Sequence, residues 1–299
     1  MSVIRRDLKR PIYWLVEHAW LAALAAVGLV MRPSITRFEM TGRDRVLAFV
    51  THPDDEIFGC AAALAAHAAA GDQVLLVAVT DGRASGALGL APDAMAAVRA
   101  TEFEAAARAL GVRGSHYRLP EGDWSDVALE RLVLAEVDSF KPDIVYAPSP
   151  VDHHIEHLRV AAVVGRVCAQ TALREVRACQ VEVPLTPVLA NLSVARTGGV
   201  VGRVAAAEAA YASQSLSLAR ARRVLAQAGA LWRAGQPLEV FWSMSPAAYA
   251  SVTSTVGSGL QFRGVRDRPF TDGLAWIVGL RERRRLVRVA ERSQRSSIT

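Results

Sequence analysis

The fold is decided by an apolar run that ends in a polar cluster, Val46-Leu47-Ala48-Phe49-Val50-Thr51-His52-Pro53-Asp54-Asp55-Glu56. The apolar half is typical of a buried strand, and an Ala-rich helical stretch follows at residues 57–70. A second apolar run occupies residues 74–79. This succession of strand, helix and strand is a βαβ unit, which predicts parallel strands joined by a helix.

The same rhythm continues along the chain. We expect helices at residues 92–110, 126–140 and 154–172, and strands at 116–119 and 143–147. Strands that are apolar throughout are typical of a parallel sheet covered on both faces. The sequence therefore predicts an α/β fold, a Rossmann-like parallel sheet with helices on both faces.

Composition narrows the class of protein. The 299 residues are 52% hydrophobic and 21% charged, which excludes a disordered chain. Three scattered cysteines exclude a disulfide scaffold and favour a reducing compartment, so we expect a cytoplasmic protein. The net charge of +6 comes with arginines gathered at both ends of the chain. These arginines have neither interleaved aromatic residues nor zinc-finger spacing, so we expect no nucleic-acid partner.

Two terminal segments lie outside the βαβ pattern. Residues 12–31 are apolar except for Glu17 and His18, which fits either a marginal membrane helix or a helix packed on the domain. Residues 274–295 combine apolar side chains with seven arginines, as in an interfacial or a solvated helix. We expect three parts, namely an apolar helix and lead-in at 1–44, a sheet domain at 45–250, and an extension with a basic tail at 251–299. Association with a membrane surface is the alternative to a wholly cytoplasmic protein.

Polar side chains follow two of the predicted strands at the point where each strand ends. The first cluster is residues 51–56. The second, residues 148–157, holds three of the seven histidines of the chain, His153, His154 and His157. Ligands of parallel sheets bind beyond the carboxyl ends of the strands, so we expect both clusters to face one crevice. An N-cap would explain one aspartate but not the histidines, and polar surface turns are the alternative.

These residue types suit a catalytic zinc ion. Such a site needs three imidazole or carboxylate ligands and one open position for water, whose pKa falls to about 7 when bound. His52, one aspartate and one histidine of the second cluster supply that set, although another divalent metal could use the same ligands. The spare aspartate can act as the base, and the spare histidine as an acid or oxyanion partner.

Four motifs resemble one family, the LmbE-like or PIG-L-type zinc-dependent de-N-acetylases. His52-Pro53-Asp54-Asp55-Glu56 matches the hallmark of that family without a change. The other matches are Thr80-Asp81-Gly82-Arg83-Ala84-Ser85-Gly86, Arg99-Ala100-Thr101-Glu102 with Ala107-Arg108-Ala109-Leu110-Gly111-Val112, and Tyr211-Ala212-Ser213-Gln214. The resemblance covers about residues 45–215 and identifies the sheet domain as LmbE-like.

The resemblance implies roles for individual residues. His52, Asp55 and His157 correspond to the metal ligands, Asp54 to the general base and His154 to the assisting residue. Ile155 and Glu156 replace the usual Pro and Asp of the second motif, so His153 competes with His154 for the assisting role. Arg99 resembles the substrate-positioning arginine, and Asp123 lies near the place of a sugar-binding aspartate.

The resemblance also implies a reaction, the removal of an N-acetyl group from an N-acetylglucosamine-type amino sugar or glycoconjugate. Another metal-dependent amidase or esterase on the same fold is one alternative, because a fold does not fix a substrate. A non-catalytic metal- or glycan-binding module is the other. The sequence specifies neither the individual substrate nor an oligomeric state.

Overall fold

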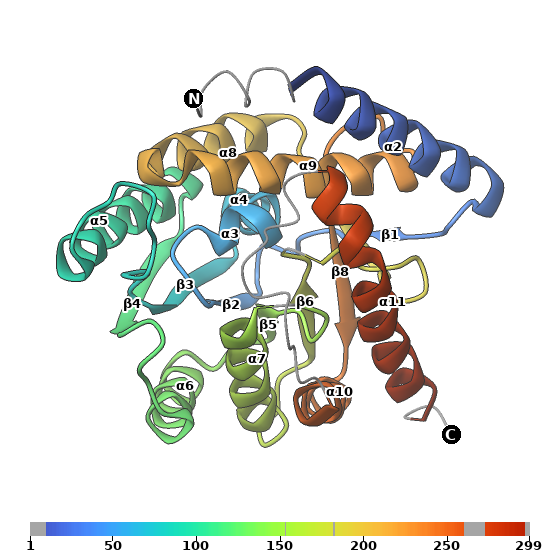
Figure 1. The fold of residues 1–299 in the computed structure, drawn as a ribbon. Helices are drawn as coiled ribbons and strands as arrows, with labels where there is room; N and C mark the ends of the chain where they lie inside the picture. The colour runs from blue at the N-terminus through green and yellow to red at the C-terminus, as the bar shows by residue number, and fades with distance from the viewer. Residues whose placement is uncertain (1–9, 153, 182, 260–272, 297–299) are drawn as a thin grey trace.

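The computed structural model describes residues 10–152, 154–181, 183–259 and 273–296. In that part of the chain, eight strands form one sheet in the order β1-β7-β8-β6-β5-β2-β3-β4 (Figure 1). The bounds are β1 Thr36–Arg37, β2 Arg45–Val50, β3 Gln73–Thr80, β4 Arg113–Leu119, β5 Ile144–Pro148, β6 Glu175–Cys179, β7 Leu192–Ala195 and β8 Leu238–Met244. Every pairing is parallel except those of β8, which runs antiparallel to β6 and β7. The predicted α/β fold is confirmed, with this one antiparallel strand as an addition.

Helices cover both faces of the sheet. Helices α3, α4, α5, α8 and α9 lie on one side, and α6, α7 and α10 on the other (Figure 1). The helices are α2 Arg10–Met31, α3 Asp55–Gly59, α4 Ala61–Ala70, α5 Pro92–Leu110, α6 Asp126–Phe140, α7 Ile155–Cys168, α8 Gly199–Ala210, α9 Ser215–Leu231, α10 Pro246–Gly259 and α11 Gly273–Ser296, with a short 3-10 turn at Ala212–Gln214.

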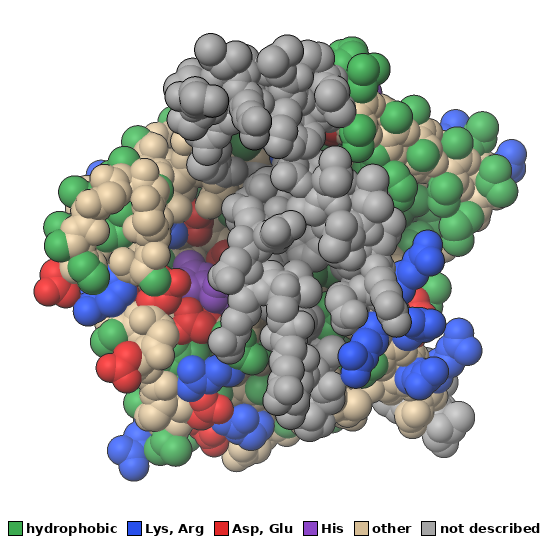
Figure 2. All heavy atoms as spheres, viewed as in Figure 1, with side chains coloured by type: hydrophobic (Ala, Val, Ile, Leu, Met, Phe, Trp, Pro, Cys, Tyr) green, Lys and Arg blue, Asp and Glu red, His purple; other side chains and the backbone are tan. Residues whose placement is uncertain are grey.

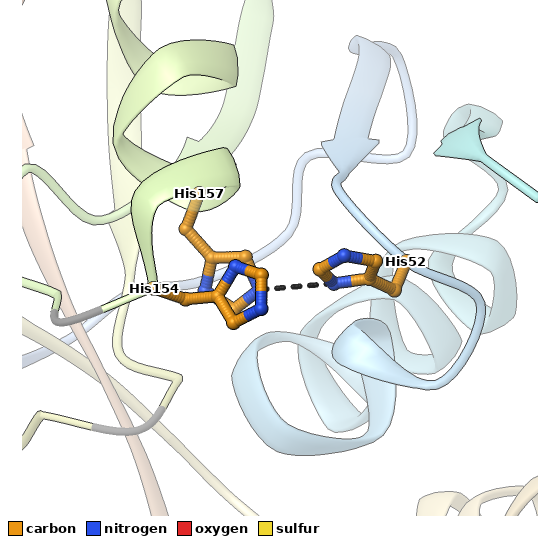
Figure 3. A group of neighbouring side chains, drawn as sticks. All are labelled: His52, His154 and His157. Carbon is orange, nitrogen blue, oxygen red and sulfur yellow. Dashed lines mark hydrogen bonds between the residues drawn. The ribbon is translucent and has the colours of Figure 1, made fainter. Parts of the chain in front are cut away.

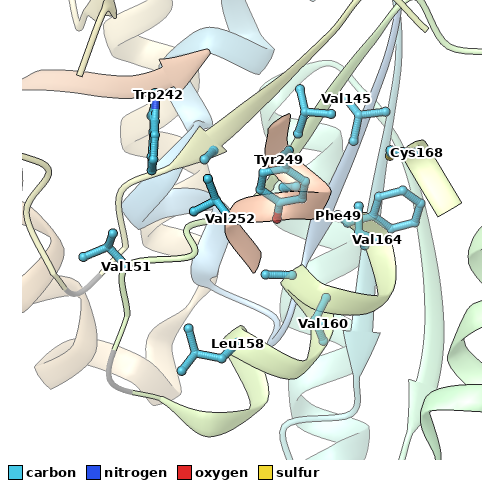
Figure 4. Packing of buried hydrophobic residues seen from close by; sticks show 14 of the residues in the cluster. Phe49, Val145, Val151, Leu158, Val160, Val164, Cys168, Trp242, Tyr249 and Val252 are labelled. Atoms are coloured by element: carbon cyan, nitrogen blue, oxygen red, sulfur yellow. The ribbon is translucent and has the colours of Figure 1, made fainter. Parts of the chain in front are cut away.

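Alternating side chains of the central strands fill two cores. Along β2, Leu47 and Phe49 join the cluster under α6, α7 and α10, whereas Val46, Ala48 and Val50 join the cluster under α4, α5 and α8. Figure 4 shows the first of these clusters around Phe49 and Tyr249. The buried Tyr249 hydroxyl donates to the Pro148 carbonyl at 2.7 Å, which ties α10 to the end of β5. This packing holds the ends of β2 and β5 rigidly side by side.

The N-terminal helix α2 lies along α9. Gly28 allows the close approach, because a Cβ atom there would lie 2.1 Å from the Leu231 carbonyl oxygen. The segment Trp14–Met31 has a mean hydropathy of 1.7 and is long and apolar enough to cross a membrane by length and composition alone. Only 6% of that segment is buried, so most of its apolar surface faces outward.

Candidate active site

The two polar clusters meet because their strands are neighbours. Strand β2 pairs with β5 in parallel, so the loops after Val50 and Pro148 emerge at the same edge of the sheet. A cavity of about 190 Å³ opens between them. It is lined by residues of both loops and of the segments around them, among them His52, Asp54, Asp55, Arg99, Glu121, His154, His157 and Gln214. The sequence prediction of one shared crevice is therefore realised in the structure.

Three side-chain atoms face one point in this cavity. His52 Nδ1 lies 3.2 Å from His157 Nε2 and 3.4 Å from Asp55 Oδ2, and the last two atoms are 3.2 Å apart. Figure 3 shows the histidine rings turned toward one another. Ligands 2.0–2.2 Å from a tetrahedral zinc ion are about 3.3–3.5 Å apart, so these three atoms have the spacing of one face of a zinc site. His52, Asp55 and His157 could hold one divalent metal ion.

Carboxylates behind the two histidines fix which nitrogen faces the cavity. His52 Nε2 lies 2.9 Å from Glu156 Oε2, and His157 Nδ1 lies 3.0 Å from Asp152 Oδ2. When both rings are neutral and each donates its N–H to that carboxylate, the lone pairs of His52 Nδ1 and His157 Nε2 face each other and the Asp55 oxygen. Three electron pairs directed at one point require a cation there, either a proton or a metal ion.

The pKa values of His52 and His157 show that their surroundings favour positive charge in the site. Burial alone would lower the pKa of His52, but hydrogen bonds to Asp55 and Glu156 raise it to about 10. Burial likewise opposes charge on His157, and the carboxylates of Asp55 and Asp152 raise its pKa well above the usual value. The surroundings of both imidazoles therefore stabilise positive charge, which a divalent metal can supply while both rings remain neutral.

Asp54 is held in an unusual backbone conformation. Its φ of 104° lies in the left-handed region, which costs on the order of 1–3 kcal/mol for a residue with a side chain. Neither aspartate caps helix α3: the Asp55 carboxylate accepts from the His52 backbone N–H at 2.8 Å, and Asp54 Oδ1 accepts from Arg99 Nη2 at 2.9 Å. Burial raises the pKa of Asp54 against the opposing charge of Arg99. The raised pKa makes the Asp54 carboxylate a better proton acceptor than an exposed aspartate.

Arg99 crosses from helix α5 into the cavity. Its Nη2 group also donates to the Pro53 carbonyl, and Nη1 lies 3.9 Å from Glu102 Oε2 as an ion pair. Among the described residues, the buried Nε and Nη1 atoms have no hydrogen-bond acceptor. Gly82 adopts a φ of +67°, and a Cβ atom there would lie 2.8 Å from Arg99 Nε. The Thr80-Asp81-Gly82 motif therefore leaves room for the guanidinium group, which has donors left for an oxygen of a substrate.

His154 lies at the N-terminal boundary of α7, next to the three facing atoms. Its ring centroid is 4.9 Å from that of His52 and 4.8 Å from that of His157. The three histidines could hold a metal by themselves, but Asp55 reaches His52 and His157 at tetrahedral spacing, so a three-ligand site does not need His154. The competing residue His153 lies outside the described residues.

The structure places Asp123 and Glu121 differently from the sequence expectation. Asp123 is exposed and does not line the cavity, whereas Glu121 does, with its carboxylate accepting from the Ala84 backbone N–H at 2.9 Å. Glu121 Oε1 lies 3.6 Å from His52 Nε2. Sequence reasoning missed Glu121, although it follows the end of β4 as directly as His52 follows β2. A second group that could hold a metal, His52 with Glu121 and Glu156, uses the Nε2 side of His52.

The Tyr211-Ala212-Ser213-Gln214 element supports the site from behind. The Tyr211 hydroxyl donates to Glu56 Oε1 at 2.5 Å, and Glu56 Oε2 accepts from the Asp54 backbone N–H at 3.2 Å. Ser213 donates to Glu102 through both its backbone N–H and its hydroxyl group. These buried contacts, which the sequence did not assign, fix the chain on either side of Asp54.

The part of the chain that carries this site matches a known family. Residues 47–168 match the family model PIG-L, described as GlcNAc-PI de-N-acetylase. No curated protein matches the chain significantly.

Three solved structures illustrate the fold. N,N'-diacetylchitobiose deacetylase from Pyrococcus horikoshii is 20% identical over 71% of this chain and 89% of its own, with a TM-score of 0.57. The 4-carboxy-2-hydroxymuconate hydratase GalB from Pseudomonas putida KT2440 is 17% identical over 67% of this chain and 95% of its own, also at 0.57. The zinc-inhibited form of teicoplanin deacetylase Orf2 is 21% identical over 67% and 97%, at 0.53. At these identities the similarity establishes the fold alone.

Proposed function

Because residues 47–168 belong to the PIG-L de-N-acetylase family, we propose that this chain is a metal-dependent hydrolase that removes an N-acetyl group from an amino sugar or glycoconjugate. The observation that supports it best is the spacing of 3.2–3.4 Å among His52 Nδ1, Asp55 Oδ2 and His157 Nε2, with Asp54 beside them. A metal-binding module alone would need the three ligands but not a buried proton acceptor.

The proposed metal is zinc, held by His52, Asp55 and His157. When bound, the ion would lower the pKa of a water molecule and polarise the acetyl carbonyl group. Imidazole and carboxylate ligands do not exclude other divalent ions, and teicoplanin deacetylase Orf2, which shares the fold, has a zinc-inhibited form. Reconstitution of the metal-free protein with several divalent ions, followed by an activity measurement with each, would identify the metal.

The chain's own residues perform the proton transfers. Asp54 accepts a proton from the attacking water and returns it to the amide nitrogen as the C–N bond breaks, which releases acetate and the free amine. Arg99 Nη2 holds the Asp54 carboxylate in place through a hydrogen bond of 2.9 Å. His154 hydrogen-bonds the oxygen that gains negative charge when the carbonyl carbon becomes tetrahedral. The Arg99 donors without a hydrogen-bond acceptor among the described residues bind an oxygen of the substrate, and Glu121 accepts from a sugar hydroxyl group in the same cavity. Asp123, which the sequence proposed for sugar binding, would reach only a substrate that extends out of the cavity.

The substrate is tested by measuring acetate release from a panel of N-acetylated sugars, nucleotide sugars and lipid-linked sugars, with metal-reconstituted protein. The proposal predicts acetate and a free amine in equal amounts from at least one member. His154→Ala should lower the rate and keep the metal, whereas His153→Ala should change little. GalB carries the same fold and is a hydratase, so a hydration product with no acetate would favour that class instead.

A further inference from the structure

A second cavity lies away from the proposed metal site, between helices α2, α9 and α11. Its volume is about 400 Å³, within the range of about 300–1,000 Å³ typical of ligand sites. Apolar side chains form most of its wall, among them Trp20 and Leu24 of α2, Leu231 of α9 and Val287 of α11. Helix α9 also lines the active-site cavity at Ser217, and the ten residues from there to Gln227, the nearest α9 residue of the second cavity, span about 15 Å of helix. The two cavities are therefore separate.

Hydrogen-bond donors without partners lie in the wall of this cavity. Gln180 is 2% exposed, and its Oε1 atom accepts from the Leu185 backbone N–H at 2.6 Å, which fixes the amide group. The Gln180 Nε2 and Trp232 Nε1 atoms are buried and have no hydrogen-bond partner within the part of the chain that the structure describes. A buried donor without an acceptor is costly, so the cavity is suited to a ligand that brings acceptor oxygens.

Positive charge borders the same cavity. Arg284 and Arg288 line it from α11, and residues 284–296 contain five exposed or half-buried arginines against one glutamate. That glutamate, Glu291, accepts from the Thr186 hydroxyl at 3.2 Å and is thereby held at the wall. A ligand with an apolar body and an anionic end would complement the apolar wall of the cavity and the arginines at its border.

The outer side of α2 is apolar and exposed next to the cavity. Trp14, Leu15, Leu29, Val30 and Met31 are each more than half exposed. Figure 2 shows hydrophobic side chains over α2 and basic side chains along α11 on one face of the molecule. Helix α2 is packed against α9, as the close approach of Gly28 to Leu231 shows, so an orientation along a membrane surface fits better than one across it.

We propose that this cavity binds an acyl chain of an anionic phospholipid, with the lipid phosphate held by Arg284 and Arg288, and so seats α2 on an anionic membrane surface. Charge favours this occupant over a second copy of the chain, because a second copy would bring the same arginines into opposition. The proposal is independent of the reaction at the metal site.

The test is co-sedimentation of the full-length protein with vesicles at low salt. Vesicles of phosphatidylcholine mixed with phosphatidylglycerol should bind the protein, and pure phosphatidylcholine vesicles at least tenfold less, since each arginine near an anionic surface contributes about 1 kcal/mol. Arg284→Glu combined with Arg288→Glu should weaken binding by roughly tenfold or more. The matched control is Arg108→Glu with Arg131→Glu, the same charge change at exposed positions of α5 and α6, which should have a much smaller effect.

A further pair of variants distinguishes binding of a lipid in the cavity from electrostatic adsorption of the protein to the vesicle surface. Leu24→Trp should fill the cavity and weaken binding to the mixed vesicles, whereas Leu132→Trp, on the exposed side of α6, should not. Circular dichroism and thermal unfolding check that each variant is folded. The proposal is overturned by equal binding to both kinds of vesicle, by equal effects of variants and controls, or by displacement with inorganic phosphate at constant ionic strength. A dimer that forms without lipid and is abolished by Val30→Glu, but not by Val127→Glu, would assign the surface to a second copy and also overturn it.

Discussion

His52 Nδ1 and His157 Nε2 lie 3.2 Å apart across 105 residues of sequence, and the other ring nitrogen of each histidine faces a carboxylate. This relationship, together with the Asp55 oxygen at 3.2–3.4 Å from both atoms, is the basis of the proposed metal site. The carboxylates behind the rings are as much a part of the site as the ligands.

The first prediction concerns those carboxylates. Glu156→Gln can still contact His52 but no longer carries the negative charge that orients its Nε2–H, so metal affinity should fall by about 10- to 100-fold. Asp152→Asn should have a similar effect through His157. Competition with a chelator of known affinity measures the change, and Glu104→Gln, at an exposed position, is the control. Unchanged metal affinity in both Glu156→Gln and Asp152→Asn would show that these carboxylates do not contribute to metal binding.

A second prediction concerns the Arg99 guanidinium group, which holds Asp54 and lines the cavity. Arg99→Ala should lower kcat/KM through both weaker substrate binding and a misplaced Asp54, while the metal content stays constant. Arg99→Lys keeps the charge but not the forked geometry, so it should recover only part of the loss. Steady-state kinetics with the substrate found in the panel provide the measurement. Wild-type kinetics for Arg99→Ala would show that the residue is structural.

Metal binding should depend on pH in a defined direction. Without metal, the carboxylate partners of His52 raise its pKa to about 10 and raise that of His157 as well, so both imidazoles bind protons at neutral pH. A metal ion must displace those protons, so apparent affinity should increase as pH rises toward that value. Calorimetric titrations in two buffers of different ionisation enthalpy should detect protons released on binding. Affinity that is constant between pH 6 and 9, roughly the range below the His52 pKa, would contradict the assignment.

Glu239 provides a prediction about stability. This buried residue of β8 accepts from the backbone N–H groups of Ala62 and Ala63 at 2.7 and 3.0 Å, in the first turn of α4, and lies 3.4 Å from Arg196. Glu239→Ala leaves those two N–H groups without their acceptor, whereas Arg196 keeps Glu208 and the Ile57 carbonyl, so the free energy of unfolding should fall by about 1–3 kcal/mol for each N–H group. Chemical denaturation measures the loss. Glu130→Ala, at a more exposed ion pair with Arg166, should cost no more than about 1 kcal/mol.

Much of the fold follows from local sequence patterns. The apolar runs at 46–50 and 74–79 lie in β2 and β3, the strand expected at 143–147 overlaps β5 from residue 144, and the expected helices at 92–110 and 126–140 coincide with α5 and α6. Strands β1, β6, β7 and β8 were not predicted, and β8 carries the buried Phe241 and Trp242. A strand added from the far end of the chain pairs through long-range contacts, which local periodicity does not report.

The site was less predictable beyond its two motifs. Adjacent strand ends bring His52 and His157 together, and that adjacency follows from a parallel sheet. The position of Glu121 rather than Asp123 in the cavity depends on a turn, where Gly122 has a φ of +83° and donates to Glu156 at 2.8 Å. The pairing of Glu156 with His52 depends on the orientation of α7 across that crevice. The spacing of residues in the sequence does not specify the direction of the Glu121 side chain or of the Glu156 side chain.

The most direct test compares metal content and acetate release in parallel for the wild type, Asp54→Asn and Asp55→Ala. Asp54 and Asp55 are adjacent, yet proton transfer is assigned to the first and metal binding to the second. Asp54→Asn should retain about one metal ion per chain while kcat falls by roughly 100- to 10,000-fold, and Asp55→Ala should lose the metal and recover activity partly in excess metal. An Asp54→Asn protein without metal, or a metal-free wild type with full activity, would contradict the proposed site.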